Sequence, residues 1–412
     1  MSGHTLDPDG PRRLLEQPDV ARVLGALAAD GEATRLVGGC VRDALLGRTG
    51  DDIDLATTLS PDAVIARAAR SMLRTIPTGI AHGTVTLLAG RSAFEVTTLR
   101  EDVETDGRHA IVRFGRDFAL DAQRRDFTIN ALSLAPGGTL HDTTGGVDDL
   151  RTGRVRFIGD ARTRIREDAL RILRFFRFHA RYGGPEIDPA GLDACVAARD
   201  DLDGLSRERV RAEFLKMLQA LGAPAALTTL SETGLLQRLI GGIGDLGRFA
   251  RLVTDHAETT AIDRLAVLAV FSEADAERLR IGLRLSKAEH ASLSGYAKAL
   301  IALRSRSSID VADMRRLAAT HDIAGLGLAS LTISERGRVG WAPEALAYIG
   351  ELAGGVREAP DFPIAGADLI ALGVRPGPEI GRRLALARRL WLEQGCPEGE
   401  ATREALLQRA TG

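Results

Sequence analysis

The sequence predicts an α+β protein in which a small mixed α/β head with a β-sheet is followed by an all-helical region. Up to about residue 150, short β-branched runs alternate with short helical patterns, whereas from about residue 160 apolar residues recur at helical spacing almost throughout. The chain has 412 residues, which is too long for a single core, so roughly two to four domains are expected.

Apolar periodicity and start signals predict three helices in the head. Residues 12–30 carry leucine and valine at helical spacing, and residues 41–46 follow a pair of glycines. Residues 61–71 begin with Ser60 as the N-cap and Pro61 at the first helical position, a combination typical of helix starts. We therefore expect one helix in each of these three segments.

Short apolar and β-branched runs supply the expected sheet. They lie at residues 35–37, 53–56, 84–88 and 94–99. The last two are separated by Ala-Gly-Arg-Ser, which predicts a hairpin. Residues 101–117 are polar and lack any period, so they predict a mobile loop.

Composition excludes several classes of protein. No apolar stretch reaches the roughly 18–20 residues that a membrane span needs, and the N-terminus has no secretory character. The three cysteines have no metal-ligand spacing, so a reducing cytoplasm is expected. The net charge of −2 is not that of a strongly basic nucleic-acid binder, although residues 151–182 carry ten arginines.

Two carboxylates beyond a glycine turn form the first candidate site. Asp52 and Asp54 are two apart on a predicted strand, so their side chains leave the same face. Carboxylates held side by side repel unless a cation lies between them, and hard oxygen ligands of this kind suit Mg²⁺. Gly38 and Gly39, followed by a helix bearing Arg42, could bring backbone amides and a guanidinium to a triphosphate.

Taken alone, Asp-x-Asp is more often an exposed pair on an edge strand. The segment is not a Walker loop, since no Gly-Lys-Ser/Thr follows, nor a G-x-G-x-x-G turn. As a whole, however, the string GG-x-VRD-x-LLG followed by D-x-D-x-A-T resembles the head motif of the class II tRNA nucleotidyltransferase and bacterial poly(A) polymerase family. That family belongs to the polymerase-β-like nucleotidyltransferases.

Two further segments carry the same resemblance. Residues 124–132, RRDFTINAL, match the second family motif, which implies that Arg125 contacts phosphate and that Asp126 and Asn130 contact ribose or support the head. Residues 142–150, DTTGGVDDL, resemble the third motif, a flexible glycine connection between the head and a helical neck.

Residues 167–178, EDALRILRFFRF, are predicted to form one helix. At about 100° per residue, Glu167, Asp168, Arg171 and Arg174 fall on one face of it. Alone, this pattern is usually an intrahelical ion pair worth a few tenths of a kcal/mol. The resemblance implies instead that Asp168 and Arg171 read the incoming base, because an acceptor beside a donor matches cytosine and adenine and faces a carbonyl in uracil and guanine.

The resemblance as a whole implies template-independent addition of C, C and A to the 3′ end of tRNA from CTP and ATP. It implies a head at residues 1–150, a neck at 151–220, a body at 221–305 and a tRNA-binding tail at 306–412. The candidate residues are Asp52 and Asp54 for catalysis and Mg²⁺; Gly39, Arg42, Arg125, Asp126, Asn130, Asp168, Arg171, Arg174 and Arg177 for the nucleotide; and Glu95 and Glu167 in support.

Three alternatives remain open. A bacterial poly(A) polymerase shares the head motifs, but it should carry a basic extension, which this sequence lacks. A partial enzyme could add only CC or only A, although in this family the CC-only form lacks the loop that residues 101–117 are expected to form. A non-catalytic RNA-binding protein is disfavoured by the intact Asp52, Asp54, Asp168 and Arg171. Neither a membrane nor an obligatory protein partner is expected.

Overall fold

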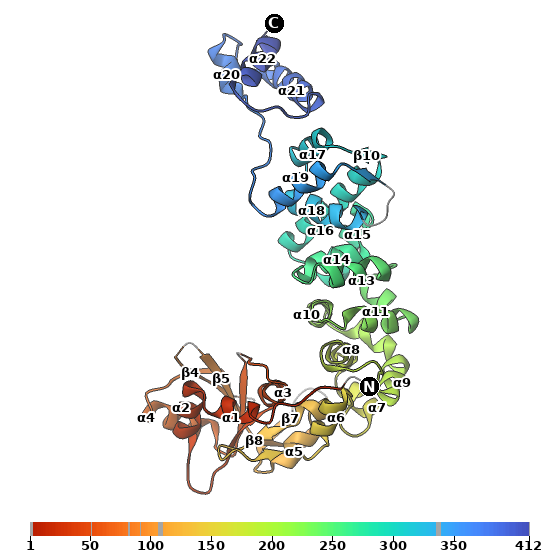
Figure 1. Ribbon diagram of the computed structural model, residues 1–412. Helices are drawn as coiled ribbons and strands as arrows, with labels where there is room; N and C mark the ends of the chain where they lie inside the picture. Colours follow the sequence, from red (N-terminus) through yellow and green to blue (C-terminus); the bar gives the residue numbers. More distant parts are fainter. Residues whose placement is uncertain are drawn as a thin grey trace. The chain divides into compact units, whose positions relative to one another are not determined.

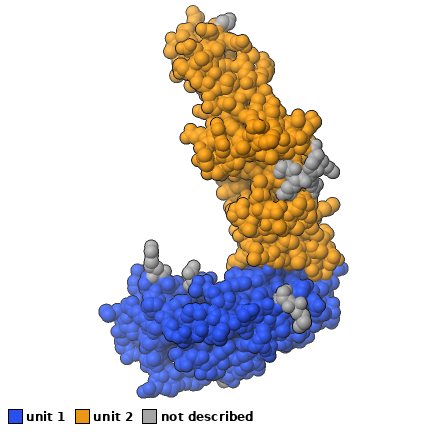
Figure 2. Space-filling view, viewed as in Figure 1, with its two compact units in different colours: residues 1–205 blue, residues 206–412 orange. Residues whose placement is uncertain are grey.

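A computed structural model describes residues 3–50, 52–80, 83–90, 92–105, 110–334 and 339–411. The chain forms two compact units, residues 1–205 and residues 206–412 (Figure 1, Figure 2). The first unit therefore includes helices beyond the predicted head boundary at residue 150. The finer division into neck, body and tail stays a prediction.

The first unit is built on a seven-stranded mixed sheet with the order β3-β4-β5-β2-β1-β8-β9. Its strands are β1 (Thr34–Val37), β2 (Ile53–Thr57), β3 (Arg74–Gly79), β4 (Thr84–Ala89), β5 (Ser92–Thr98), β8 (Ser133–Leu134) and β9 (Leu140–His141). The predicted hairpin is confirmed, since β4 and β5 pair antiparallel, while β2 and β5 pair in parallel. The α+β class predicted from the sequence is thus confirmed.

The two faces of this sheet differ in polarity because side chains alternate along each strand. One face carries fully buried residues such as Leu36, Leu55 and Phe94, and helices α2, α3 and α4 pack against the sheet. The other face carries Asp54 and Glu95. The candidate carboxylates therefore lie on the polar face.

The helices of the head follow the prediction with one correction. They are α1 (Gly10–Leu15), α2 (Pro18–Leu27), α3 (Gly39–Leu45), α4 (Pro61–Arg70), α5 (Phe118–Gln123) and α6 (Gly146–Thr152). The predicted N-cap is confirmed, because Ser60 accepts a hydrogen bond from the Ala63 amide. The single helix over 12–30 is wrong: Gln17 is extended because it precedes Pro18, and two helices result.

The predicted mobile loop at 101–117 is also wrong in part. Strands β6 (Arg100–Thr105) and β7 (Ala110–Phe114) pair antiparallel in a two-stranded sheet of their own. A two-stranded ribbon needs no alternating apolar face, because its backbone hydrogen bonds form whatever the side chains are. The polar, aperiodic sequence therefore did not indicate the pairing of β6 with β7. The tip of the predicted loop, residues 106–109, lies outside the described residues.

The glycine connection at 142–150 is a tightly bonded turn. The Asp142 carboxylate accepts hydrogen bonds from the backbone amides of Thr144, Gly145, Gly146 and Val147 at 2.9–3.1 Å. A Cβ at Gly146 would lie 2.3 Å from the Thr128 carbonyl oxygen. Close packing and these hydrogen bonds hold the backbone of this turn, and the predicted flexibility of the connection stays a prediction.

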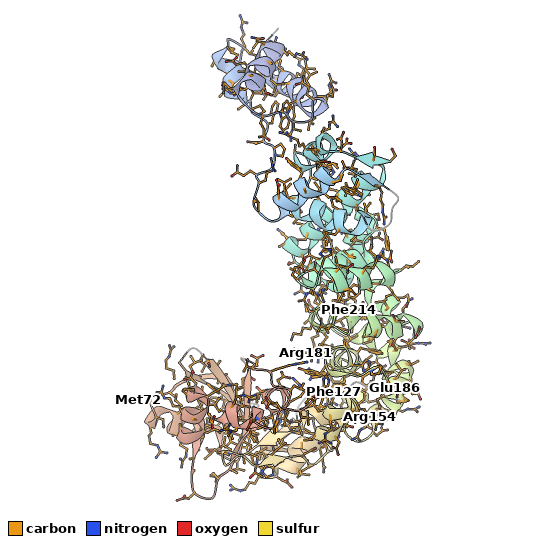
Figure 3. All side chains as sticks on the ribbon, in the orientation of Figure 1. Met72, Phe127, Arg154, Arg181, Glu186 and Phe214 are labelled. Carbon is orange, nitrogen blue, oxygen red and sulfur yellow. The ribbon has the colours of Figure 1, made fainter. Side chains whose placement is uncertain are left out.

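The rest of the first unit is helical. It comprises η2 (Thr128–Asn130), α7 (Ala161–Glu167), α8 (Arg171–Tyr182), α9 (Pro189–Ala197) and η3 (Arg199–Gly204). Phe127, labelled in Figure 3, lies in an aromatic cluster that fixes α8 against the second motif. Its ring centroid is 4.9 Å from that of Phe157 and 5.2 Å from that of Phe178. The second motif and α8 therefore share one core.

The second unit is almost entirely helical, as predicted. It comprises α10 (Arg207–Leu218), α11 (Ala223–Glu232), α12 (Leu235–Ile240), α13 (Leu246–Asp255), α14 (Ala261–Ala269), α15 (Glu273–Leu283), α16 (Lys287–Arg304), α17 (Val311–Ala318), α18 (Ile323–Ser334), α19 (Pro343–Ala353), α20 (Gly366–Ala371), α21 (Pro378–Glu393) and α22 (Glu400–Thr411), with short strands β10 (Ser308–Ile309) and β11 (Gly340–Trp341). Trp391 centres a separate small core in the last three helices. In the described part of the chain, no helix is long and apolar enough to cross a membrane.

Candidate active site

A glycine turn joins β1 to α3 and opens the site. Gly38 has a φ of 74°, a left-handed conformation that glycine adopts without a steric penalty. A Cβ there would lie 2.9 Å from Nη1 of Arg125, so the missing side chain also makes room for this guanidinium. Gly39 begins α3 at its first turn. The predicted turn is confirmed, and it brings Arg125 beside the helix start.

The carboxylates lie on the polar face next to this turn. Asp54 and Glu95 are register partners on the parallel strands β2 and β5, and Val37 is the partner of Asp54 on β1. Asp52 directly precedes β2 and is exposed, whereas Asp54 is half-buried. Glu95, whose face the sequence could not determine, thus shares the face of Asp54.

Repulsion is evident at Asp54. Burial, followed by the charge of Glu95, raises the pKa of this carboxyl above its ordinary value, and Asp52 adds to the effect while Arg125 opposes it. Among the residues that the structure describes, no three Asp, Glu, His or Cys side chains form a preformed metal cage. A cation on this face would take one or two of these carboxylates and complete its coordination from the substrate.

Four predicted residues form a buried hydrogen-bonded chain. Arg42 donates to Oδ1 of Asn130, and Nδ2 of Asn130 donates to Oδ1 of Asp126 over 3.0 Å. Nε of Arg174 donates to the other oxygen, Oδ2, over 2.7 Å. The structure therefore brings residues of α3, the second motif and α8 together.

This hydrogen-bonded chain of side chains favours the ionised form of Asp126. Burial alone would raise the pKa of this carboxyl, but the charge of Arg174 and the hydrogen bonds from Asn130 and Arg174 hold it below its ordinary value. Both oxygens of Asp126 are engaged within the protein. Of the two roles inferred for Asp126 and Asn130, ribose contact or support, this geometry favours support.

Asp43 and Tyr182 belong to the same network and were missed by the sequence reasoning. Nε of Arg42 donates to Oδ1 of Asp43 over 2.9 Å, and the Tyr182 hydroxyl donates to the same oxygen over 3.0 Å. The Arg42 guanidinium also lies 4.1 Å from the centroid of the Tyr182 ring. Asp43 belongs to the VRD string, so the first motif could have identified it. Nothing in the sequence around Tyr182 points to this contact.

The predicted helix 167–178 is two helices. α7 ends at Glu167, Asp168 is its C-cap with a φ of −155°, and α8 begins at Arg171. The Asp168 carboxylate accepts a hydrogen bond from the Leu170 amide over 3.1 Å. The argument that placed Asp168 and Arg171 on one face of one helix is therefore wrong, because a capping aspartate interrupts the helix.

Glu167 holds Arg171, as the sequence suggested. The two side chains form an ion pair, and Nη1 of Arg171 donates to the Arg164 carbonyl oxygen over 2.7 Å. Arg164 in turn lies 3.0 Å from both Glu167 oxygens. The Arg171 guanidinium is thus fixed at the junction of α7 and α8, although its predicted role in base reading is not tested by this contact.

The remaining predicted arginines lie beside this network. Nε of Arg125 donates to Asp121 over 3.2 Å, and its Nη1 donates to the Asn130 carbonyl oxygen over 3.3 Å. The Arg177 guanidinium lies 4.4 Å from the centroid of the Phe178 ring. Carboxylates on an open sheet face and arginines around it can bind an anionic, metal-bound substrate.

Comparison with known proteins gives matches over most of the chain. The family model described as the Poly A polymerase head domain matches residues 34–156, and the one described as a probable RNA and SrmB-binding site of polymerase A matches residues 185–243. The chain is 37% identical to the mitochondrial CCA tRNA nucleotidyltransferase 1 of Danio rerio, covering 87% of this chain and 83% of that protein. It is 30% identical to the CCA-adding enzyme of Latilactobacillus sakei, covering 94% and 96%.

Solved structures share the fold. The CCA-adding enzyme of Bacillus stearothermophilus in complex with CTP superposes with a TM-score of 0.70 at 24% identity, covering 95% of this chain and 98% of that one. The Thermotoga maritima CCA-adding enzyme complexed with tRNA has a TM-score of 0.67 at 20% identity, covering 97% of both chains. At these identities, the structures establish similarity of fold.

Proposed function

This chain belongs to the CCA tRNA nucleotidyltransferase family, and we propose that it adds C, C and A to the 3′ end of tRNA from CTP and ATP without a nucleic-acid template. The observation that carries the proposal is that Asp54 lies on the polar face of the sheet beside the glycine turn, with the exposed Asp52 two residues before it. The relatives that match more than four fifths of the chain are named for this reaction.

In the proposed reaction, the 3′ oxygen of the RNA forms a bond to the α-phosphorus of the nucleotide. The bond from that phosphorus to the bridging oxygen breaks, pyrophosphate leaves with the electron pair, and the hydroxyl proton passes to solvent. Arg125 lies beside the glycine turn, where it can hold the triphosphate. Arg42 and Arg174 are engaged with Asn130 and Asp126, so they chiefly fix the site around the nucleotide.

Asp52 and Asp54 are the residues that would hold Mg²⁺. They fit this ion because the Asp54 carboxyl, crowded by Glu95 and by burial, has a raised pKa that a cation would lower. When bound, the ion supplies Lewis-acid chemistry at the phosphate and favours loss of the 3′-hydroxyl proton. Glu95 lies opposite Asp54 and is proposed to support the same ion.

Base selection is proposed for Asp168 and Arg171 at the junction of α7 and α8. The Asp168 carboxylate accepts from the exocyclic amine of cytosine or adenine, and the Arg171 guanidinium donates to the neighbouring ring atom. Uracil or guanine would place a carbonyl oxygen against the carboxylate, which costs about 1–3 kcal/mol for each polar group left unpaired. Glu167 supports this readout because it fixes Arg171.

The last helices are proposed to hold the tRNA by its backbone. The segment 372–378 turns through Gly373, whose φ is 89°, and leads into α21 at Pro378. Amides at such a turn can meet backbone phosphates without reading bases. Recognition by shape and backbone is the general mode for double-stranded RNA.

A poly(A) polymerase shares the head, and the match to the Poly A polymerase head domain at residues 34–156 covers the part that both enzymes have in common.

The cytoplasmic location stays a prediction, since relatives include proteins named as mitochondrial.

One assay tests the proposal. Purified protein is incubated with Mg²⁺ and with tRNA ending before CCA, after C or after CC, and each labelled nucleotide is supplied in turn. Addition of two C residues and then one A, followed by arrest, is expected. Continued addition of A would indicate a poly(A) polymerase, and no addition to any substrate would contradict an enzymatic role.

A further inference from the structure

A cavity of about 480 Å³ lies on the first unit between the sheet edge and the segment that enters α5. Arg35 of β1, Ser133 of β8 and His141 of β9 line one side of it, and Phe118 lines the other. None of these residues belongs to the predicted site. The function proposed above leaves this cavity unused.

The polar groups on the sheet side of the cavity lack partners within the described part of the chain. Ser133 and His141 line the cavity, and neither side chain makes a hydrogen bond among the described residues; neither has a buried, unsatisfied polar atom, so both reach the solvent of the cavity. The Arg35 guanidinium stacks 4.0 Å from the centroid of the Phe118 ring and has no carboxylate partner. Polar groups that reach the solvent of a cavity and have no protein partner are available to a ligand.

The other charged groups that line the cavity are already engaged. Arg116 forms an ion pair with Glu32 at 3.0 Å, and the Asp117 carboxylate accepts hydrogen bonds from the amides of Ala119 and Leu120. The charge left without a partner is therefore the positive charge of Arg35. A planar guanidinium, a hydroxyl and an imidazole N–H together suit the oxygens of a phosphate group.

The cavity lies on the same face of the sheet as the catalytic carboxylates. Val37 of β1 is the register partner of both Asp54 and Ser133, and Ser133 is the partner of His141. Arg35 is two residues from Val37, or about 7 Å along the strand. An RNA strand whose 3′ end reaches Asp54 can therefore pass the cavity on this face.

We propose that this cavity binds a backbone phosphate of the RNA substrate upstream of the reacting 3′ end. Arg35 supplies the charge and the donor fork, while Ser133 and His141 donate to the remaining oxygens. The contact carries no sequence information, so it positions the RNA for all three additions alike. This inference rests on the proposed function, because it assumes that RNA is the substrate.

The first experiment distinguishes a contact with the RNA from a contact with the nucleotide. Arg35→Ala and Ser133→Ala are expected to raise the KM for tRNA about fivefold or more, which corresponds to the loss of one hydrogen bond or charge contact of about 1 kcal/mol. The KM for CTP and ATP and the kcat at saturating tRNA should stay unchanged. Arg35→Lys, which keeps the charge, should recover part of the loss. An unchanged KM for tRNA in both alanine variants overturns the proposal.

The measurement of the KM for tRNA needs two controls. Arg70→Ala removes an equal charge from an exposed position at the end of α4, two residues from Met72 (Figure 3), and should leave the KM for tRNA unchanged. Ser133→Ala removes only a hydroxyl that has no partner, so its thermal stability should match that of the wild type. An equal rise in KM for tRNA in Arg70→Ala would mean that general charge, not the cavity, binds the RNA.

The second experiment detects binding without catalysis. The His141 ring is followed by NMR in the full-length protein without Mg²⁺ while either a short single-stranded RNA or pyrophosphate is added. Burial and the charge of Arg35 lower the pKa of His141, so a phosphate bound nearby should raise that pKa. A larger shift with RNA than with pyrophosphate at equal phosphate concentration supports the proposal. An equal or larger shift with pyrophosphate, or no shift with either, overturns it. This readout stands even if the protein adds no nucleotide, so the two proposals can fail separately.

Discussion

Asp54 and Glu95 lie opposite each other on the adjacent parallel strands β2 and β5, with their side chains on the same polar face. Burial, followed by the charge of Glu95, raises the pKa of Asp54. The folded protein without a cation is therefore strained at the very position where the proposed chemistry needs negative charge.

Asp54→Asn should lower nucleotide addition by about a hundredfold or more, because the proposed metal ligand is lost. The same change should raise the thermal stability of the metal-free protein at neutral pH. The folded-state pKa of Asp54 is raised, so its stabilising contribution is present below the unfolded pKa and is lost as pH rises through the folded pKa. Since asparagine cannot ionise, it avoids this loss.

Thermal melts across pH check the stability part. The advantage of Asp54→Asn should shrink as the pH falls below the ordinary aspartate range. Asp52→Asn is the matched comparison, because Asp52 is exposed and contributes less than burial and Glu95 to the raised pKa of Asp54; it should lose activity but gain less stability than Asp54→Asn. A melting temperature for Asp54→Asn below that of the wild type at neutral pH would contradict the repulsion argument.

Tyr182→Phe should raise the KM for CTP and ATP about threefold to tenfold and change kcat little. The variant loses the hydrogen bond to Asp43, a loss of about 1 kcal/mol, and with it part of the alignment of Arg42. Tyr348→Phe is the control, since that buried hydroxyl has no hydrogen-bond partner in the described structure. Equal effects of both changes on KM would show that Tyr182 does not position Arg42.

Arg171→Ala should lower kcat/KM for CTP and ATP more than for UTP, so that the discrimination against UTP becomes smaller. Glu167→Gln should move selectivity in the same direction but less, because it weakens the ion pair that fixes Arg171. Arg174→Ala should instead slow all nucleotides alike, since Arg174 pairs with Asp126. Relative kcat/KM values for the four nucleotides decide the matter. If Arg171→Ala lowered kcat/KM equally for all four nucleotides, the α7–α8 junction would support the site without reading the base.

Removing residues 103–113, which include most of the β6–β7 ribbon, should impair the final A more than the two C additions. The ribbon is a sheet separate from the seven-stranded one, so the fold of the head should survive its removal. Sequencing the product ends measures each step. Equal loss at all three positions would indicate that the ribbon is only structural.

Sequence reasoning identified the motif of the candidate site because its signals are local. The glycine turn and the capped helix after Ser60 depend on neighbouring residues alone, and the structure confirms both. Asp54 lies on β2, whereas Asp52, which was predicted on the same strand, directly precedes it. Contacts between distant segments left no such signal. The partner of Glu95 depends on which strands pair, and the position of Tyr182 beside Arg42 depends on how α8 packs.

The sequence by itself determined the α+β class and the order of the elements around the site, because local propensity and hydrophobic period act over a few residues. The helical period alone did not show that Asp168 ends α7 instead of sharing a helix with Arg171; the folded structure shows it, since a local hydrogen bond from the Leu170 amide to the Asp168 side chain competes with the helix. Only the tertiary structure decided that Asp126 accepts hydrogen bonds from Arg174 and Asn130, because a buried carboxylate needs donors and takes them from the segments that pack beside it.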